Sequence, residues 1–212
     1  MLFSSEVFDI SLRALMVSGS ATILASCWSI PIAHYLAIKH RSEFVTSILE
    51  ALVGIPTTVI GLLFYFLFSS KGPLGFLHLL YSPQAIIIGQ SVLITPLIIS
   101  TGYRVIRSST ELYGELAISL GASKWQAMAL TMRESMPGII ASVVMGFSRA
   151  FGELGVALMI GGNIRGYTRV LTTAIVLEVS KGEFEKALSL GLILVTISIS
   201  LSIVLRVLRR LS

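Results

Sequence analysis

Five long apolar stretches constrain this chain more than any other feature of its sequence. They cover residues 15–38, 44–68, 85–103, 138–164 and 187–205. A helix needs about 20 mostly apolar residues to cross a bilayer, and each stretch is close to that length or longer. Because lipid cannot hydrogen-bond to the backbone, such segments cross membranes as helices. We therefore predict an all-α membrane protein with five transmembrane helices in a single domain, residues 1–212.

The remaining composition narrows the class further. Only 13% of the residues are charged, whereas soluble domains carry about 25%. The single cysteine, Cys27, excludes an intramolecular disulfide and argues against a multi-cysteine metal site. A shorter apolar run, residues 170–177, is too short to cross and is expected to be interfacial or re-entrant.

The basic residues between the stretches predict the orientation. Lys and Arg are enriched in short cytoplasmic loops. One side collects Lys39, Arg41, Arg104, Arg107, Lys124, Arg133, Arg206, Arg209 and Arg210. The other side collects Lys71, Arg165, Arg169, Lys181 and Lys186. We therefore expect a multi-pass protein with its N-terminus outside and its C-terminus in the cytoplasm. Topology thus explains most of the net charge of +5, and no basic stripe on a soluble face indicates nucleic-acid binding.

A polar stretch, residues 108–137, interrupts the apolar pattern on the predicted cytoplasmic side. Ser108 and Glu111 have the spacing of a capping box and predict the start of a helix. Gly121 suits the left-handed residue that ends such a helix. The stretch is too polar for lipid and predicts a cytoplasmic helical hairpin.

The second arm of this hairpin has its own start signal. Ser123 and Gln126 repeat the capping-box spacing and predict a second short helix. Pro137, with Ser135 as a possible cap, predicts that a third helix begins there. One apolar face is predicted from residues at helical spacing: Trp125, Met128 or Ala129, Met132 and Met136.

The second apolar stretch contains a proline flanked by glycines and threonines. Pro56 lacks a backbone donor and predicts a kink, and the hydroxyls of Thr57 and Thr58 can bond the freed carbonyls. A polar kink at membrane depth can line a pathway. It can equally be a packed kink of the kind common in membrane helices.

The fourth stretch carries two charges, Arg149 and Glu153. Their spacing of four places them on one helical face. An ionisable group at the bilayer centre costs about 2.5–3.5 kcal/mol, so the pair must face protein or water. Either the two charges only neutralise each other, or Arg149 presents positive charge to an anion while Glu153 holds its geometry. Ser142, Gly146 and Ala150 form a small-residue seam that predicts close helix packing, within the chain or at a subunit interface.

The external loop after this stretch contains Asn163, Arg165 and Arg169. Gly161 and Gly166 have the spacing of a phosphate loop, but the Lys-Ser/Thr pair that must follow is absent. The loop is therefore either a solvated connection or a contact surface, and no nucleotide site is predicted. We expect the chain to be non-catalytic.

The hairpin resembles the cytoplasmic coupling loop of ABC importer permeases. Glu115, Ala117 and Gly121 match that family's Glu-Ala-Ala…Gly signature, with Leu116 replacing the first Ala. The run from Gly121 through Ala122 and Ser123 is similar too, whereas Pro137 departs from the family's Ile-x-Leu-Pro ending. The kink around residues 54–61 and residues 72–75 resemble the molybdate and tungstate branch. Residues 149–153, 162–164 and 168–173 are similar to tungstate permeases in particular.

This resemblance implies a type I ABC importer permease in the cytoplasmic (inner) membrane. The chain would be the transmembrane subunit of an ATP-driven importer for an oxyanion, with tungstate favoured and molybdate or sulfate as alternatives. A pair of separate ATPase subunits would hold the ATP and Mg, an external binding protein would deliver the anion, and two copies of the chain would form a homodimer. The rival classes are an ATP-independent carrier or channel and an integral membrane enzyme. The enzyme has no support from residue clusters in the sequence.

Overall fold

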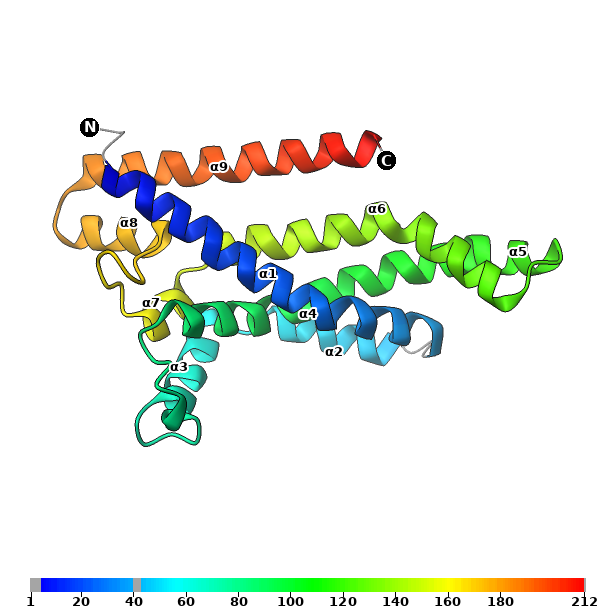
Figure 1. Ribbon diagram of the computed structural model, residues 1–212, viewed down its shortest axis with the longest axis horizontal. Helices are drawn as coiled ribbons and strands as arrows, with labels where there is room; N and C mark the ends of the chain where they lie inside the picture. The colour runs from blue at the N-terminus through cyan, green and yellow to red at the C-terminus, as the bar shows by residue number, and fades with distance from the viewer. Residues whose placement is uncertain (1–4, 40–42, 212) are drawn as a thin grey trace.

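The computed structural model describes residues 5–39 and 43–211, which form helices joined by short connections (Figure 1). In chain order the elements are α1 (Ser5–Lys39), α2 (Glu43–Val53), α3 (Thr57–Phe68), the 3-10 turn η1 (Gly75–Leu77), α4 (Pro83–Ser109), the π-helical turn η2 (Thr110–Gly114), α5 (Glu115–Ser119), α6 (Lys124–Phe151), α7 (Gly155–Gly161), α8 (Leu171–Ser180) and α9 (Phe184–Leu211). The described chain is thus helical, as the apolar stretches predict.

Within the described residues, three helical segments are long and apolar enough to cross a membrane: α1, the continuous stretch Pro83–Ser119, and Phe184–Leu201 within α9. Two further pairs pass the same test together but are bent. The α2–α3 pair bends by 83° and the α6–α7 pair by 56°. Counting each bent pair as one span gives up to five crossings. The ten-residue α8 is too short to cross, as its composition predicts.

The centre of the molecule is a tight contact of α1 with α4. Helix α1 buries a face of small residues: Ala14, Ser18, Ala21, Thr22, Ala25, Ser29, Ala33 and Ala37. Small side chains let two helices approach closely, which is how membrane helices gain packing energy. The Trp28 indole adds a 2.8 Å hydrogen bond to the Thr95 hydroxyl on α4. Gly146 of α6 also packs against Ile98 of α4. The small-residue seam on α6 therefore packs within the chain.

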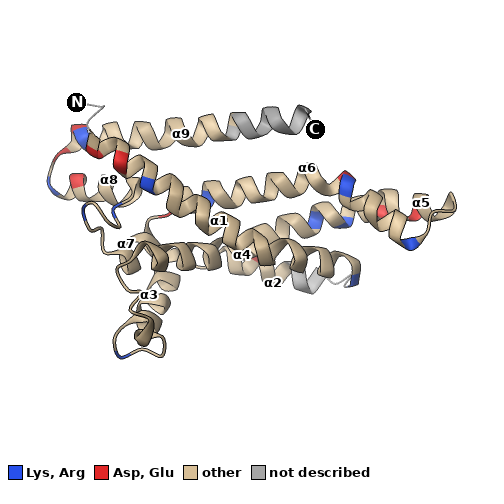
Figure 2. Ribbon diagram, in the orientation of Figure 1, with Lys and Arg blue, Asp and Glu red and all other residues tan. Residues whose placement is uncertain are grey.

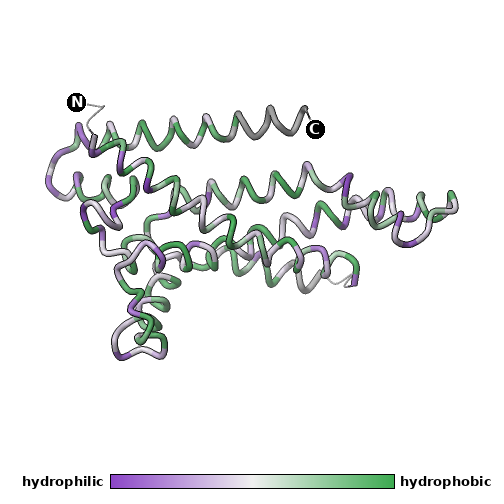
Figure 3. Tube along the Cα trace, viewed as in Figure 1, coloured by the Kyte–Doolittle hydropathy of each residue, from purple (hydrophilic) through white to green (hydrophobic). Residues whose placement is uncertain are grey.

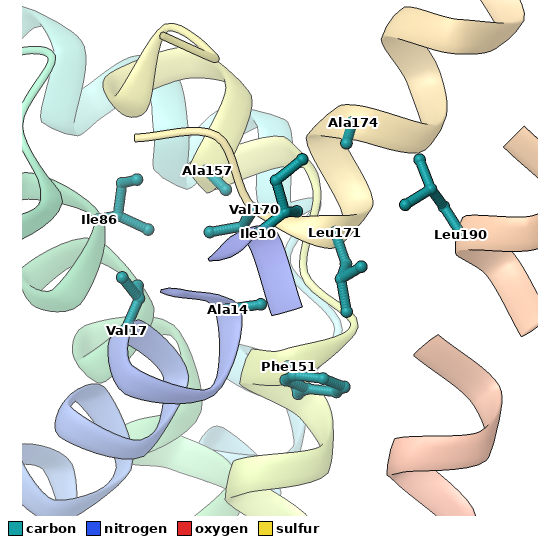
Figure 4. Close-up of a cluster of buried hydrophobic side chains, with 10 residues drawn as sticks. All are labelled: Ile10, Ala14, Val17, Ile86, Phe151, Ala157, Val170, Leu171, Ala174 and Leu190. Atoms are coloured by element: carbon teal, nitrogen blue, oxygen red, sulfur yellow. The ribbon is translucent and has the colours of Figure 1, made fainter. Parts of the chain in front are cut away.

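One apolar cluster joins six helices at the end of the molecule where the chain begins (Figure 4). Its buried members are Ile10, Ala14, Val17, Ile86, Phe151, Ala157, Val170, Leu171, Ala174 and Leu190. Hydrophobic residues continue along the helices, whereas hydrophilic ones gather in the connections at the ends (Figure 3). Helix α9 leaves Leu188, Leu192, Val195 and Ile199 exposed along one stripe. That spacing of three to four residues is typical of a helix face in contact with lipid.

Three helix boundaries differ from the sequence predictions. No helix begins at Ser108, because α4 runs through it and continues into η2, while Glu111 pairs with Arg107 instead of capping. No helix begins at Pro137 either, since α6 passes through it. Finally, residues 138–164 are not one continuous helix, because α6 ends at Phe151 and α7 begins at Gly155.

The charged residues lie mainly toward the two ends of the molecule (Figure 2). Arg104 and Arg107 lie in the last turns of α4, and Lys124 and Arg133 lie in the first turns of α6, so all four are near the hairpin, on the predicted cytoplasmic side. Arg41 lies outside the described residues, and the side chains of Arg206, Arg209 and Arg210 are not described. Glu50 is bonded by Arg104 at 2.6 Å, so this acid points to a neighbouring helix.

Candidate functional site

The break between α6 and α7 brings together the two charges that stand out in the sequence. Gly152 caps α6, and the Glu153 amide bonds the Ala150 carbonyl at 3.1 Å. Glu153 therefore lies beyond the end of α6, and the prediction that both charges share one helical face is wrong. The two side chains still meet, because Arg149 Nη1 lies 3.3 Å from Glu153 Oε2.

The Glu153 carboxylate also forms a hydrogen bond with the backbone. Its Oε1 accepts a 3.2 Å hydrogen bond from the Val156 amide, which is one of the free donors at the start of α7. The side chain of Glu153 is only 2% exposed. A buried carboxylate that binds a backbone donor and an arginine is well compensated, so it holds the start of α7 in place.

Arg149 differs from its partner in exposure. Its side chain is 40% exposed, and within the described residues one of its N–H donors is engaged, by Glu153. A guanidinium has five donors, so most of those of Arg149 have no partner among the described residues. Since lipid contact would cost about 2.5–3.5 kcal/mol, this face must meet water, an anion or another protein surface.

The two breaks pack directly against each other. Helices α3 and α7 cross at Gly61 and Gly155, where the backbones approach closely. A Cβ added at Gly155 would lie 2.6 Å from the Thr57 hydroxyl oxygen and 3.1 Å from the Thr58 amide nitrogen. The predicted kink at Pro56 is confirmed, and it lies beside the break that carries Glu153.

Two details of the kink differ from the predictions. In the described part of the chain, no hydrogen bond joins the hydroxyls of Thr57 and Thr58 to the freed carbonyls. The sequence also indicated a single kinked span, whereas the structure has two bent pairs that meet.

The hairpin at the opposite end is formed by α5, a turn and the start of α6. Gly121 has the predicted left-handed conformation, with φ of 89°. Ser123 and Gln126 form the predicted capping box, with hydrogen bonds of 3.3 and 2.8 Å. Ala117 is buried, and its carbonyl bonds the Ala122 amide, which closes the turn.

The tip of the hairpin exposes large apolar side chains. Leu120 is 79% exposed and Trp125 is 76% exposed, while Glu115 and Leu116 are exposed beside them. The predicted apolar face through Trp125 and Met136 is therefore not the packed face of α6. That face consists of Ala127, Thr131, Ser135 and Ile139. An apolar tip on a polar hairpin is typical of a protein contact surface.

The loop between α7 and α8 is tied to the first turns of α1. Arg165 makes two hydrogen bonds with Glu6, at 2.8 and 2.9 Å. Arg169 bonds Asn163 at 3.2 Å and lies 3.8 Å from Glu6. A cavity of about 210 Å³ opens here, lined by Ser5, Glu6, Asp9, Ile10, Arg13, Arg165, Gly166 and Arg169. The loop is thus an ordered surface with several charges.

Sequence reasoning missed four residues that shape these sites. Arg13 donates to the carbonyls of Arg169 and Gly166, and Glu6 pairs with Arg165. Gln90 and Thr172 bond the backbone of the α6–α7 break. Gln90 had a signal, since it is the one amide side chain in the uncharged stretch 85–103, and Thr172 lies in the stretch 168–173 that resembles tungstate permeases.

The family described as binding-protein-dependent transport system inner membrane component matches residues 29–211. The tungstate uptake system permease protein TupB of Peptoclostridium acidaminophilum is 35% identical over 205 residues, which covers 96% of this chain and 90% of that protein. A probable anion ABC transporter permease protein of Haloferax volcanii is 33% identical over 89% of this chain and 84% of its own. The molybdenum transport system permease protein ModB of Haemophilus influenzae is 29% identical, with 77% of each chain covered.

Proposed function

Because this chain belongs to the family of binding-protein-dependent transport system inner membrane components, we propose that it is the transmembrane subunit of an ATP-driven importer for an oxyanion. The family match confirms the resemblance of the chain to ABC importer permeases. Tungstate is the first candidate, because two of the similar permeases carry that anion in their names. Molybdate and sulfate remain alternatives of the same tetrahedral shape.

The observation that carries the proposal is the half-exposed Arg149 beside two meeting helix breaks. A planar guanidinium suits an oxyanion, because it donates several hydrogen bonds in a fixed geometry. In this mechanism Arg149 meets the anion, and Glu153 holds the arginine while capping α7. Pro56, Thr57 and Thr58 form the neighbouring wall of the pathway.

A second copy of the chain would enclose this pathway. Most donors of Arg149 have no partner in the described chain, so a single copy gives this partly exposed charge no protein group to meet. A homodimer that faces its two α6–α7 breaks inward turns the same arginines toward a shared aqueous path. The stripe of exposed apolar residues on α9 would then face lipid.

Coupling to ATP would occur at the hairpin. Glu115, Leu116, Ala117, Gly121, Ala122 and Ser123 shape a tip that fits a groove on a separate ATPase subunit. ATP and Mg would bind that subunit, and this chain would remain non-catalytic. At the other end, Asn163, Arg165 and Arg169 would contact the external binding protein. Closure of the ATPase pair would move the hairpins as rigid bodies and switch access between the two sides.

The test is uptake into vesicles that contain this chain with its ATPase subunits and the loaded binding protein. We expect uptake that requires ATP, and a preference among tungstate, molybdate and sulfate that follows the affinity of the binding protein. Vesicles that lack the ATPase provide the control. No uptake of any of the three anions by the complete complex would contradict the proposal.

One observation favours a second candidate, an ATP-independent carrier. Secondary transporters often place a pair of broken helices at their binding site, and this chain has two bent pairs in contact. The same vesicles decide between the candidates. Uptake at an equal rate without the ATPase would support the carrier.

A further inference from the structure

Gln90 is a buried amide in the apolar helix α4, and it connects three helices. Its side chain is 2% exposed. Its Oε1 accepts a 3.3 Å hydrogen bond from Ser18 on α1, and its Nε2 donates a 3.1 Å hydrogen bond to the Ala150 carbonyl on α6. Both ends of the amide are therefore satisfied by different helices, which fixes its orientation.

The Ala150 carbonyl is where regular α6 geometry ends. In a continuous helix this carbonyl would accept from the amide four residues later, which belongs to Leu154. Here α6 stops at Phe151, and the carbonyl accepts from the Glu153 amide instead. Gln90 supplies a second donor to the same oxygen. The shortened turn that places Glu153 is therefore held from the α4 side.

Thr172 holds the same residue from the other side. Its hydroxyl, on the first turn of α8, donates a 2.8 Å hydrogen bond to the Glu153 carbonyl. The Glu153 amide thus donates to the Ala150 carbonyl, which Gln90 also bonds, and the Glu153 carbonyl accepts from Thr172. With both peptide groups fixed, the carboxylate points between the Val156 amide and the Arg149 guanidinium.

We propose that Gln90 and Thr172 are positioning residues that clamp the backbone of Glu153 and thereby aim Arg149 into the anion pathway. The inference rests on the proposed function of Arg149. Neither residue touches the anion in this arrangement. They act through hydrogen bonds to the backbone, because a charge that serves a passing ion must be held in one geometry.

The test uses variants that remove the hydrogen bond and keep the shape. Gln90→Met and Thr172→Val delete the two donors with little change in volume. Thr95→Val is the matched control, because it makes the same chemical change on α4 and removes the bond from Trp28, but leaves the hydrogen bonds to the backbone of Ala150 and Glu153 in place. Each variant is assembled with the ATPase subunits and assayed in vesicles with loaded binding protein, after its melting temperature has been measured in detergent.

We expect Gln90→Met and Thr172→Val to lower the maximal uptake rate about tenfold, which corresponds to ~1.4 kcal/mol in the barrier. The concentration of loaded binding protein that gives half-maximal uptake should stay unchanged, since delivery of the anion precedes its passage. The double variant should be no slower than the slower single variant, because both side chains hold one backbone segment. Thr95→Val should transport like the wild type.

The outcomes separate this inference from the proposed function. Wild-type vesicles without ATP-dependent uptake would contradict the proposed function and the inference with it. Active wild-type vesicles with equally active Gln90→Met would overturn the inference alone. It would also be overturned if Thr95→Val were as slow as Gln90→Met, or if uptake fell only in parallel with the melting temperature. Either result would assign Gln90 to helix packing.

Discussion

Arg149 is the residue on which the proposed transport mechanism depends most directly. We predict that Arg149→Met lowers the uptake rate at least tenfold, because the anion loses a charged hydrogen-bond donor whose interactions are worth about 1.5–3 kcal/mol. Uptake by reconstituted vesicles measures this change. The double variant Arg149→Met/Glu153→Gln removes both charges and so avoids leaving a buried carboxylate without its partner. If that stably folded double variant transported normally, the pair would serve packing alone.

At the scale of single residues, the sequence identified the important charges but did not predict most of their contacts. Arg149 and Glu153 could be found because a charge in an apolar run is costly and therefore conspicuous. Their ion pair was foreseen, but the placement of Glu153 beyond the helix end was not. Gly152 ends α6 through its backbone conformation, and nothing in the spacing of the two charges reports that. Thr172 was missed because a threonine at the start of a short apolar helix is ordinary.

At the scale of elements, the crossing of α3 and α7 joins the two helix breaks. We predict that Gly155→Ala destabilises the protein by about 1–3 kcal/mol, because its new Cβ would lie 2.6 Å from the Thr57 hydroxyl oxygen. The melting temperature in detergent measures the effect. Gly191→Ala on α9 is the control: apart from the adjacent backbone of α9, no atom of the described residues lies within 4 Å of its added Cβ, so it should be neutral or slightly stabilising. Equal melting temperatures for both variants would show that the crossing tolerates a wider separation.

The hairpin carries a prediction about coupling. We predict that Glu115→Lys uncouples ATP hydrolysis from uptake, since it reverses a charge on the exposed surface that would dock on the ATPase. Hydrolysis and uptake are measured in the same vesicles, together with co-purification of the ATPase subunit. Glu185→Lys is the control, because it reverses an exposed charge at the start of α9, at the opposite end of the molecule (Figure 1). Normal coupling in Glu115→Lys would remove this residue from the docking surface.

Helix ends were predicted correctly where a local capping signal determines them. They were predicted wrongly where a long helix continues through such a signal. The capping box at Ser123 and the left-handed Gly121 are local signals, and both are confirmed. Ser108 and Pro137 carry signals of the same type, yet α4 and α6 run through them. Packing of the long helices outweighs one interior proline or a misplaced cap. The π-helical turn η2 had no signal in the sequence.

At the scale of the whole molecule, the apolar stretches were the most informative feature. All five coincide with described helices or bent helix pairs, because the requirement for internally bonded backbone in lipid leaves little choice of structure. The two bends were harder to foresee. Pro56 predicted one of them. The other lies at a contact of Gly155 with Thr57, which joins residues almost one hundred positions apart. The orientation of the termini stays a prediction from the positive charges.

The arrangement of two copies leads to a prediction about water access. If the α6–α7 breaks face a shared aqueous pathway, position 149 should be wet in the assembled complex, whereas the exposed face of α9 should meet lipid. The single native cysteine, which is exposed, is first removed by Cys27→Ser. In that background we expect Arg149→Cys to react with a charged, water-soluble thiol reagent and Val195→Cys to stay unreactive. Val195 is the matched control, because it is more than half exposed on a helix without a proposed partner.

Labelling is measured in sealed vesicles, with the reagent supplied to one side of the membrane at a time, in the presence and in the absence of ATP. If alternating access operates, the side from which position 149 reacts should change with ATP. Protection of position 149 from both sides in both states would place Arg149 in a packed or lipid-covered surface and contradict the pathway.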